Sequence, residues 1–221
     1  MTQTDTTSIR EATFEQHAFR GWFNAEFFRR MDPYIESKLG PHKQRVFAGL
    51  PREVVEIGPG AGANLPYLPE NTALVAIEPN RAMHEPLRSA AGQHHVTIDL
   101  RERMAERTGL ADHSVDAVIS SLVLCSVQDP HAALAEIRRI LRPGGTFRFL
   151  EHVVAPDGTA TRAAQRILRR PWAWTFEGCS CERDLERDIR AAGFADVQVE
   201  NYRIRSPFLP FNTHIAGVAT A

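Results

Sequence analysis

The 221-residue chain is expected to adopt an α/β fold with a seven-stranded, doubly wound sheet. Short β-branched runs alternate with helical patterns through the first two thirds of the chain, which is typical of parallel sheets covered by helices on both faces. A glycine-rich turn follows the first run. The last two apolar runs, "DVQVENYRI" and "HIAGVATA", are separated by "RSPFLPFN" rather than by a helix. They predict an antiparallel pair that closes the sheet.

The predicted strands are short apolar runs, and the early ones lack the polar alternation of a half-exposed strand. This indicates burial on both faces. The runs cover residues 53–57, 73–79, 95–100, 115–124, 146–153, 196–204 and 214–221.

Helices are expected before and between these strands. Over residues 14–50, apolar side chains recur every four positions, and Gly40-Pro41 is expected to end this helix before a second, short one. Asp129 should cap a helix that ends near Arg142, and Gly193 should close another. The remaining predicted helices cover residues 82–92, 161–174 and 181–194. We expect residues 1–50 to form a tail, disordered to about residue 13, and a helical lid. Residues 51–221 should form the main domain, with a helical insertion around 160–176.

Composition excludes several classes of protein. A net charge of −1 lacks the basic excess of a nucleic-acid-binding protein. Three cysteines do not make a secreted disulfide framework, and Cys179-Ser180-Cys181 is too tightly spaced for the usual zinc pair, so no metal site is expected. No uncharged apolar run approaches the ~20 residues of a membrane span. We therefore expect a cytoplasmic protein, monomeric or homodimeric, without a membrane or nucleic-acid partner.

The turn after the first strand reads Glu56-x-Gly58-x-Gly60-x-Gly62. Glycines allow a ligand to approach the main chain closely, and N–H groups at the start of the following segment favour an anionic group. Gly58-x-Gly60-x-x-Ala63 also satisfies the dinucleotide fingerprint, and Glu78 stands where a carboxylate accepts hydrogen bonds from ribose hydroxyls. The glycine pattern alone therefore leaves a nicotinamide or flavin dinucleotide open.

Four features favour a nucleoside that carries a positive charge over a nicotinamide or flavin dinucleotide. Glu56 would repel a pyrophosphate but attract a sulfonium or an ammonium. Ala105-Glu106, after the third strand, can accept from an adenine amino group. Asp116 opens the fourth strand and "IRRILRPGG" leads into the fifth. The terminal antiparallel pair completes a pattern that resembles the class I S-adenosylmethionine-dependent methyltransferases, which have a Rossmann-like fold. The resemblance implies S-adenosyl-L-methionine as cofactor, held by Glu56, Gly58, Pro59, Gly60, Gly62, Glu78, Pro79, Ala105, Glu106, Ser121 and Leu122.

Within that class the chain is similar to the thiol S-methyltransferase branch of the methyltransferase-like proteins. The most specific matches are "LVLCSV", "FLEHV" and the GC-x-x-x-R of Gly178, Cys179 and Arg183. The likeness runs from Val54 to Ala221, and the rest of it is shared with the wider methyltransferase type 11 group. Glu78 replaces the usual Asp, and Pro59 replaces a small residue. The hydrophobic anchor of the animal members is not seen near the start of this sequence.

His152, at the end of the fifth strand, is the predicted catalytic residue, which would orient or deprotonate the acceptor. The alternative is a histidine that only caps the strand or binds a main-chain carbonyl. Cys125 is expected to line the donor site as a small apolar residue. Cys179 and Arg183 are expected to order the lid and a helix start. Aromatic side chains of both helical segments are expected to roof the acceptor site: Phe19, Trp22, Phe23, Phe27, Phe28, Trp172, Trp174 and Phe176.

These features predict methyl transfer from S-adenosyl-L-methionine to a small apolar molecule, with a thiol favoured. An O-, N- or C-methyltransferase of a secondary metabolite or quinone remains an alternative. A non-catalytic binding module is disfavoured, because the glycines, Glu56 and Glu78 are all in place. An RNA methyltransferase is disfavoured by the missing basic excess and by "SSLV" in place of an NPPY-type tetrapeptide.

Overall fold

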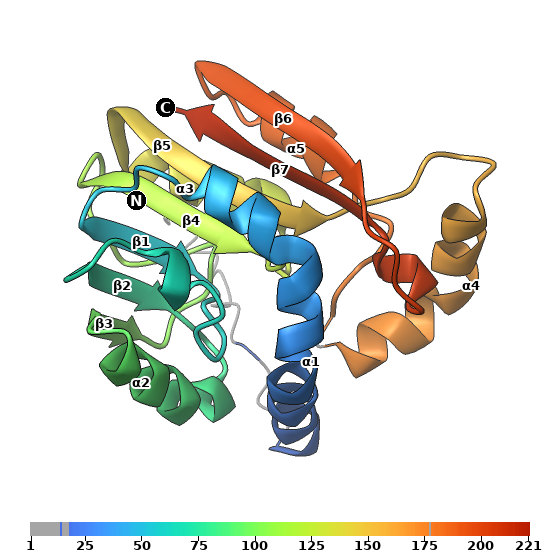
Figure 1. The fold of residues 1–221 in the computed structure, drawn as a ribbon. Helices are drawn as coiled ribbons and strands as arrows, with labels where there is room; N and C mark the ends of the chain where they lie inside the picture. Colours follow the sequence, from blue (N-terminus) through green and yellow to red (C-terminus); the bar gives the residue numbers. More distant parts are fainter. Residues whose placement is uncertain (1–13, 15–17, 177) are drawn as a thin grey trace, which may run out of the picture.

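A computed structural model describes residue 14 and residues 18–176 and 178–221, so the predicted disorder of residues 1–13 lies outside the described residues. One seven-stranded sheet has the order β3-β2-β1-β4-β5-β7-β6 (Figure 1). β1 to β5 are parallel, and β7 runs antiparallel between β5 and β6, which confirms the predicted sheet. The strands are β1 (Glu53–Ile57), β2 (Ala73–Ile77), β3 (Thr97–Arg101), β4 (Val115–Ser121), β5 (Leu141–His152), β6 (Asp196–Arg203) and β7 (Thr213–Thr220).

Helices cover both faces of the sheet (Figure 1). On one face, α2 (His84–Gln93) and the segment that follows α1 (Ala18–Val46) bury Leu87 and Phe47 against β1 and β2. On the other, α3 (Pro130–Ile140) and α5 (Leu185–Ala191) bury Leu134 and Ile189 against β4, β5 and β7. The insertion helix α4 (Ala160–Thr175) lies beyond the end of β5, where it contacts the 3-10 turn η3 (Leu209–Phe211).

Polar side chains set the helix starts. The Asp129 carboxylate accepts hydrogen bonds from the main-chain N–H groups of His131 and Ala132, and Pro130 occupies the first position of α3. The Thr159 and Asp184 side chains cap α4 and α5 in the same way. Gly193 follows α5 with a φ of 82°, the left-handed conformation that ends many helices.

The predicted helix break at Gly40-Pro41 is wrong, because α1 continues to Val46 with Pro41 inside it. A proline there removes one helical hydrogen bond, but the surrounding turn is held by burial of Leu39 and Lys43. A Cβ on Gly40 would lie only 2.9 Å from the Tyr67 hydroxyl oxygen. The glycine therefore serves close packing against Tyr67 rather than helix termination.

The predicted start of the fifth strand is also wrong. β5 begins at Leu141, directly after α3, and includes the "RPGG" segment that was expected to lie outside it. Val115 pairs with Leu141 and Ala117 pairs with Thr146, so the intervening residues form a bulge on the β5 side. α5 begins at Leu185, later than the predicted 181.

Candidate active site

A cavity of about 730 Å³ opens at the carboxyl ends of β1 to β5. This volume lies within the range of small-molecule sites. The strand order reverses between β1 and β4, and open α/β sheets bind ligands at that point. The lining includes the predicted residues Gly58, Pro59, Gly60, Gly62, Glu78, Pro79, Ala105, Glu106, Ser121, Leu122 and His152.

Gly60 is the position where the main chain is open to a ligand. Gly58, Gly60 and Gly62 all have positive φ values, of 62°, 56° and 97°. A Cβ on Gly58 would meet Val123 at 2.6 Å, and one on Gly62 would meet Leu65 at 2.7 Å. A Cβ on Gly60 would have no neighbour within 4 Å. Two glycines therefore serve internal packing, and the third leaves space for a ligand.

Glu78 joins the ends of the first two strands. Its Oε2 accepts a hydrogen bond from the Gly60 N–H at 3.0 Å, and its Oε1 accepts one from the Asn80 N–H at 2.8 Å. A carboxylate oxygen has more than one lone pair, so Glu78 can also accept from ribose hydroxyls while it holds the loop.

Glu106 has an acceptor that is free among the described residues. Its Oε1 accepts from the Asp129 N–H at 3.0 Å, whereas its buried Oε2 has no hydrogen-bond partner in the described part of the chain. Buried polar atoms are normally paired. An amino-group donor such as that of adenine fits this position, so the residues present fit the predicted nucleoside.

Glu56 lies beneath the loop rather than in the cavity lining. It is fully buried, and its Oε1 accepts a hydrogen bond from the Asn64 side-chain nitrogen at 2.7 Å. Burial raises the pKa of the Glu56 carboxyl to about 7. Asn64 lines the cavity, so the structure places this amide, which the sequence did not single out, between Glu56 and the ligand space.

Helix α1 supplies a partly buried ion pair that sequence analysis missed. Lys43 Nζ donates to Glu36 Oε2 and to the Ala63 carbonyl oxygen, both at 3.0 Å, and both side chains line the cavity. The spacing of seven residues places the pair on one helix face. Lys43 thereby ties α1 to the glycine loop.

Leu122 has an unusual main-chain conformation for a leucine, with a φ of 61°. It follows β4 and lines the cavity, and its N–H donates to the Leu150 carbonyl oxygen at 2.8 Å. Non-glycine residues held in this left-handed region often occur at functional sites. No sequence pattern indicated this conformation.

Aromatic side chains form the wall at the other end of the cavity. Phe27, Trp172 and Phe176 line it as predicted, with ring centroids 5.3 Å apart for Phe27–Phe176 and 4.5 Å for Trp172–Phe176. Phe208 and Phe211 join them from the β6–β7 connection. Trp174, by contrast, is 65% exposed. Phe23 is partly exposed, and the side chains of Phe19, Trp22 and Phe28 lie outside the described ones.

His152 is the last residue of β5, fully buried, and lines the cavity beside this wall. Its Nε2 lies 3.0 Å from the Pro210 carbonyl oxygen, which also accepts from Gln165 Nε2 at 3.1 Å. Since a carbonyl oxygen can only accept, Nε2 carries the proton and Nδ1 presents a lone pair. The neighbouring Glu151 binds Ser120 and the Val123 N–H instead.

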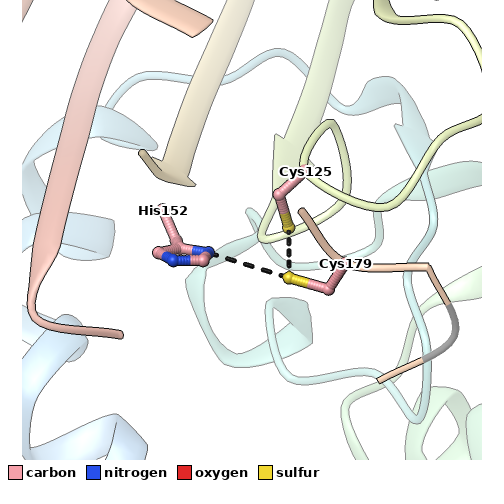
Figure 2. Close-up of side chains that lie close together, drawn as sticks. All are labelled: Cys125, His152 and Cys179. Carbon is pink, nitrogen blue, oxygen red and sulfur yellow. Dashed lines mark hydrogen bonds between the residues drawn. The ribbon is translucent and has the colours of Figure 1, made fainter. Parts of the chain in front are cut away.

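Two cysteines lie next to that lone pair (Figure 2). The Cys179 sulfur is 3.8 Å from His152 Nδ1 and 3.4 Å from the Cys125 sulfur, and Trp172 Nε1–H donates to it at 3.4 Å. The hydrogen bond between the sulfurs lowers the pKa of the Cys179 thiol and raises that of Cys125. Sequence analysis missed this group, because Cys125 and Cys179 are 54 residues apart.

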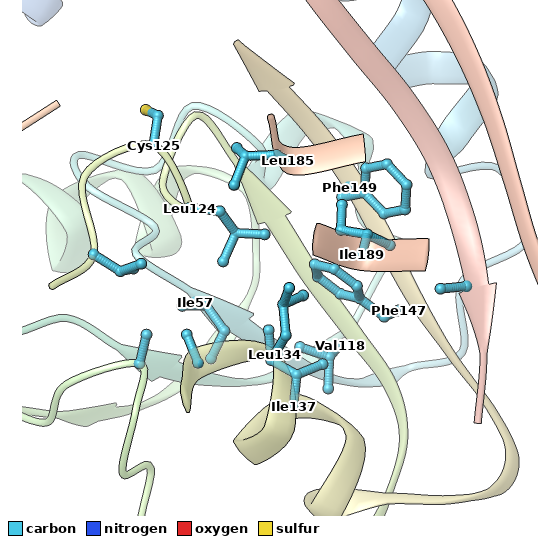
Figure 3. Close-up of a cluster of buried hydrophobic side chains, with 14 of the residues drawn as sticks. Ile57, Val118, Leu124, Cys125, Leu134, Ile137, Phe147, Phe149, Leu185 and Ile189 are labelled. Carbon is cyan, nitrogen blue, oxygen red and sulfur yellow. The ribbon is translucent and has the colours of Figure 1, made fainter. Parts of the chain in front are cut away.

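Arg183 holds the loop that carries Cys125. Its guanidinium donates to the carbonyl oxygens of Leu124 and Val127, the latter at 2.6 Å. Cys125 itself lies at the edge of the apolar cluster near Leu124 and Leu185 (Figure 3). Arg183 therefore orders the loop after β4, a role different from the predicted ordering of the lid.

A parallel sheet with an antiparallel β7, a glycine loop after β1 and a carboxylate after β2 define a class I S-adenosylmethionine-dependent methyltransferase. The methyltransferase domain family matches residues 55–149. Thiol S-methyltransferase TMT1B of Homo sapiens is 32% identical over 209 residues, 85% of this chain and 84% of that protein. TMT1B of Rattus norvegicus is 36% identical over 172 residues, 75% and 69% of the two chains. The chain therefore belongs to the family of S-adenosylmethionine-dependent methyltransferases that includes these thiol S-methyltransferases.

Solved structures show the same fold. A putative methyltransferase in complex with the Trm112 activator of Haloferax volcanii has a TM-score of 0.66 at 17% identity, and covers 94% of this chain and 99% of that one. A possible histamine N-methyltransferase of Thermotoga maritima has a TM-score of 0.64 at 20% identity, and covers 91% and 99%. Among the helices of the described residues, none has the length and apolar character needed to cross a membrane.

Proposed function

We propose that this methyltransferase transfers the methyl group of S-adenosyl-L-methionine to the sulfur of a small apolar thiol. The observation that carries the acceptor class is the wall around His152. It is built of Trp172, Phe176, Phe211 and two cysteine side chains, whereas the acidic groups Glu78 and Glu106 line the donor part of the cavity. The names of the relatives, thiol S-methyltransferases, support the same acceptor.

The donor part is assigned to the nucleoside. The open main chain at Gly60, the Glu78 carboxylate and the Glu106 oxygen that has no partner among the described residues would hold the methionine end, the ribose and the adenine, in that order. When bound, S-adenosyl-L-methionine supplies a methyl carbon already activated by its sulfonium charge. The protein's main task is then to orient the acceptor, which can account for ~7–11 kcal/mol of the barrier.

A cysteine thiol, with a pKa of ~8.5, is a few per cent thiolate at neutral pH and is strongly nucleophilic. A simple alkyl thiol is a weaker acid, so a group that helps its proton to leave would speed the transfer. His152 acts as a positioning residue whose Nδ1 lone pair faces the acceptor region. Phe27 of α1 and Trp172 of α4 line that region, which supports the proposal that the two helices roof the acceptor site.

The acceptor class is tested with molecules of matched shape. The purified chain is incubated with labelled S-adenosyl-L-methionine and with 1-butanethiol, 1-butanol, butylamine or phenol. The expected result is label in butyl methyl sulfide and little in the other products. Transfer to phenol or butylamine with none to the thiol would refute a thiol acceptor and favour the O- or N-methyltransferase alternative.

A further inference from the structure

Three side chains with metal-binding atoms meet at the acceptor wall. Sγ of Cys125, Sγ of Cys179 and a ring nitrogen of His152 all lie within 4.8 Å of one another, and all three residues are buried and line the cavity. We propose that they form a Zn²⁺ site whose open fourth position faces the cavity and binds the acceptor sulfur as a thiolate. This proposal rests on the proposed thiol function and assigns the group that holds the acceptor.

Two of the three interatomic distances are close to those of a tetrahedral zinc site. With Zn–S of ~2.3 Å and Zn–N of ~2.0–2.1 Å, tetrahedral angles place two sulfurs about 3.8 Å apart and a sulfur and a nitrogen about 3.6 Å apart. The observed separations are 3.4 Å between the sulfurs and 3.8 Å between Cys179 Sγ and His152 Nδ1. Cys125 Sγ lies within 4.8 Å of the His152 ring nitrogen, so a movement of the Cys125 side chain toward His152 of up to about 1.2 Å would close the site around the ion.

The surrounding hydrogen bonds prepare the ligand atoms. Metal-binding histidines normally donate their other ring N–H to a carbonyl or carboxylate. His152 Nε2 has such an acceptor in the Pro210 carbonyl oxygen, so Nδ1 is the free ligand atom. The Trp172 indole N–H donates to the Cys179 sulfur and stabilises a thiolate there. A small apolar cysteine would not need the Trp172 hydrogen bond for its packing.

Charge and ligand chemistry also favour Zn²⁺. Thiolate and imidazole ligands are those that zinc prefers. Two thiolates and one neutral imidazole cancel the two positive charges of the ion, which removes most of the cost of burying it. Three protein ligands leave one tetrahedral position open, as in catalytic rather than structural zinc sites.

The fourth position suits a thiol acceptor. The S–H proton of the bound thiol leaves to solvent, and the sulfur remains as a thiolate with a lone pair free for the methyl carbon. A metal-bound thiol is deprotonated at neutral pH. The thioether product carries no charge and binds zinc more weakly than a thiolate, so it can leave. Trp172 and Phe176 would hold the alkyl chain of the acceptor.

Metal content is the first test. The full-length chain, kept reduced with a phosphine, is equilibrated with Zn²⁺, desalted and analysed by mass spectrometry of the elements. We expect about one Zn²⁺ per chain in the native protein and at least about tenfold less in Cys125→Ser and Cys179→Ser. Cys181→Ser is the matched control, since Cys181 is equally buried but bonds the Gln165 carbonyl oxygen. Equal zinc in all four proteins, or none in any, would overturn the proposal.

Cobalt reports on the open position. Co²⁺ replaces Zn²⁺ in the native protein, and the visible spectrum is recorded before and after addition of 1-butanethiol or 1-butanol. A change with the thiol alone supports a sulfur ligand in the fourth position, and no change overturns it. Binding of S-adenosylhomocysteine, measured by calorimetry, checks that the serine variants are folded. If they are not, the cobalt spectrum of the native protein still decides.

The same preparation separates the two proposals. If a chelator removes the metal and thiol methylation continues at its full rate, the role of the metal in binding the acceptor sulfur is refuted and the thiol function stands. If Co²⁺ binds and responds to the thiol but no thiol is methylated, the thiol function is refuted and the metal site stands.

Discussion

The Glu78 carboxylate, at the end of β2, accepts a hydrogen bond at 3.0 Å from the main-chain N–H of Gly60, in the loop after β1. Its second oxygen accepts from the Asn80 N–H at 2.8 Å. One side chain thus fixes the glycine loop and presents the predicted ribose acceptor. Donor binding should depend on the carboxylate itself rather than on the size of the side chain.

Glu78→Gln should weaken binding of S-adenosylhomocysteine by about 10- to 100-fold. The amide NH₂ would face a main-chain N–H in place of a carboxylate oxygen, and each lost or unsatisfied charged hydrogen bond costs about 1.5–3 kcal/mol. Calorimetric titration measures the affinity. Glu78→Asp keeps a carboxylate and should lie much nearer to the native value; an equal loss in both variants would argue that side-chain length decides.

Gly60→Ala should reduce donor affinity at least about tenfold while the protein stays folded. A Cβ there would meet no protein atom, so its effect beyond backbone strain falls on the ligand. Gly109→Ala is a matched control, because Gly109 also has positive φ and an open Cβ direction but lies outside the cavity lining. Both variants should lose about 1–2 kcal/mol of stability, because a Cβ is strained in the left-handed conformation. Equal donor affinity in the two variants would remove Gly60 from the donor site.

Glu56 should make the protein less stable as pH rises. Its folded-state pKa, raised by burial to about 7, lies above the usual 4.5. Between those values the folded chain holds a proton that the unfolded chain has released, so the free energy of unfolding falls with increasing pH. The free energy of unfolding begins to fall above the pKa of Glu56 in the unfolded chain, and the fall is complete above the pKa of Glu56 in the folded chain.

The Glu56→Gln variant tests this dependence, because it keeps an oxygen for the hydrogen bond from Asn64 but cannot ionise. The free energy of unfolding is measured with urea at pH 5 and at pH 8. Between these pH values the native chain should lose about 2 kcal/mol more of its free energy of unfolding than the variant does. Glu151, whose pKa burial also raises to about 7, is present in both proteins and cancels in the comparison. Parallel pH profiles would show that Glu56 does not titrate in this range.

Trp172→Ala should raise KM for 1-butanethiol about tenfold and leave donor affinity nearly unchanged. Trp172 lines the acceptor end, and removal of an aromatic contact costs about 1–3 kcal/mol of apolar burial. Steady-state kinetics over a series of alkyl thiols should show the largest effect for longer chains. Trp174→Ala, on the same helix but 65% exposed, is expected to change KM less than about twofold. Similar KM values in the two variants would exclude an acceptor role for the Trp172 ring.

Local patterns predicted most of the sheet. β1 covers the predicted residues 53–57, because a short β-branched run that ends at glycines favours a strand over a helix. The errors lie where tertiary packing overrides a local signal. Gly40 and Pro41 remain helical, with Leu39 and Lys43 buried beside them. The "RPGG" segment is held at the sheet because the flanking residues Leu141 and Thr146 pair with β4 and because Gly144 and Gly145 exchange main-chain hydrogen bonds with Ala221.

Most of the residues proposed to bind the donor line one cavity, and the sequence could single them out because they follow strand ends in a fixed order along the chain. Asn64 was not, since its importance comes only from its contact with the buried Glu56. The grouping of Cys125, His152 and Cys179 depends on the end of β5 meeting two distant loops, and their separations of 54 and 27 residues carry no local pattern. A sequence can indicate such side chains singly, but only the fold brings them together.

The Pro210 carbonyl oxygen receives hydrogen bonds from both His152 and Gln165, so β5, α4 and the β6–β7 connection share one anchoring atom. The residues proposed to bind the donor follow β1 to β4 and make none of these hydrogen bonds. Gln165 also donates to the Val153 carbonyl oxygen and accepts from the Ala155 N–H, so several main-chain groups fix α4 to the end of β5. If the acceptor site lies at this junction, as proposed, exchange of α4 and the 204–212 connection would change the acceptor preference without altering the proposed donor residues.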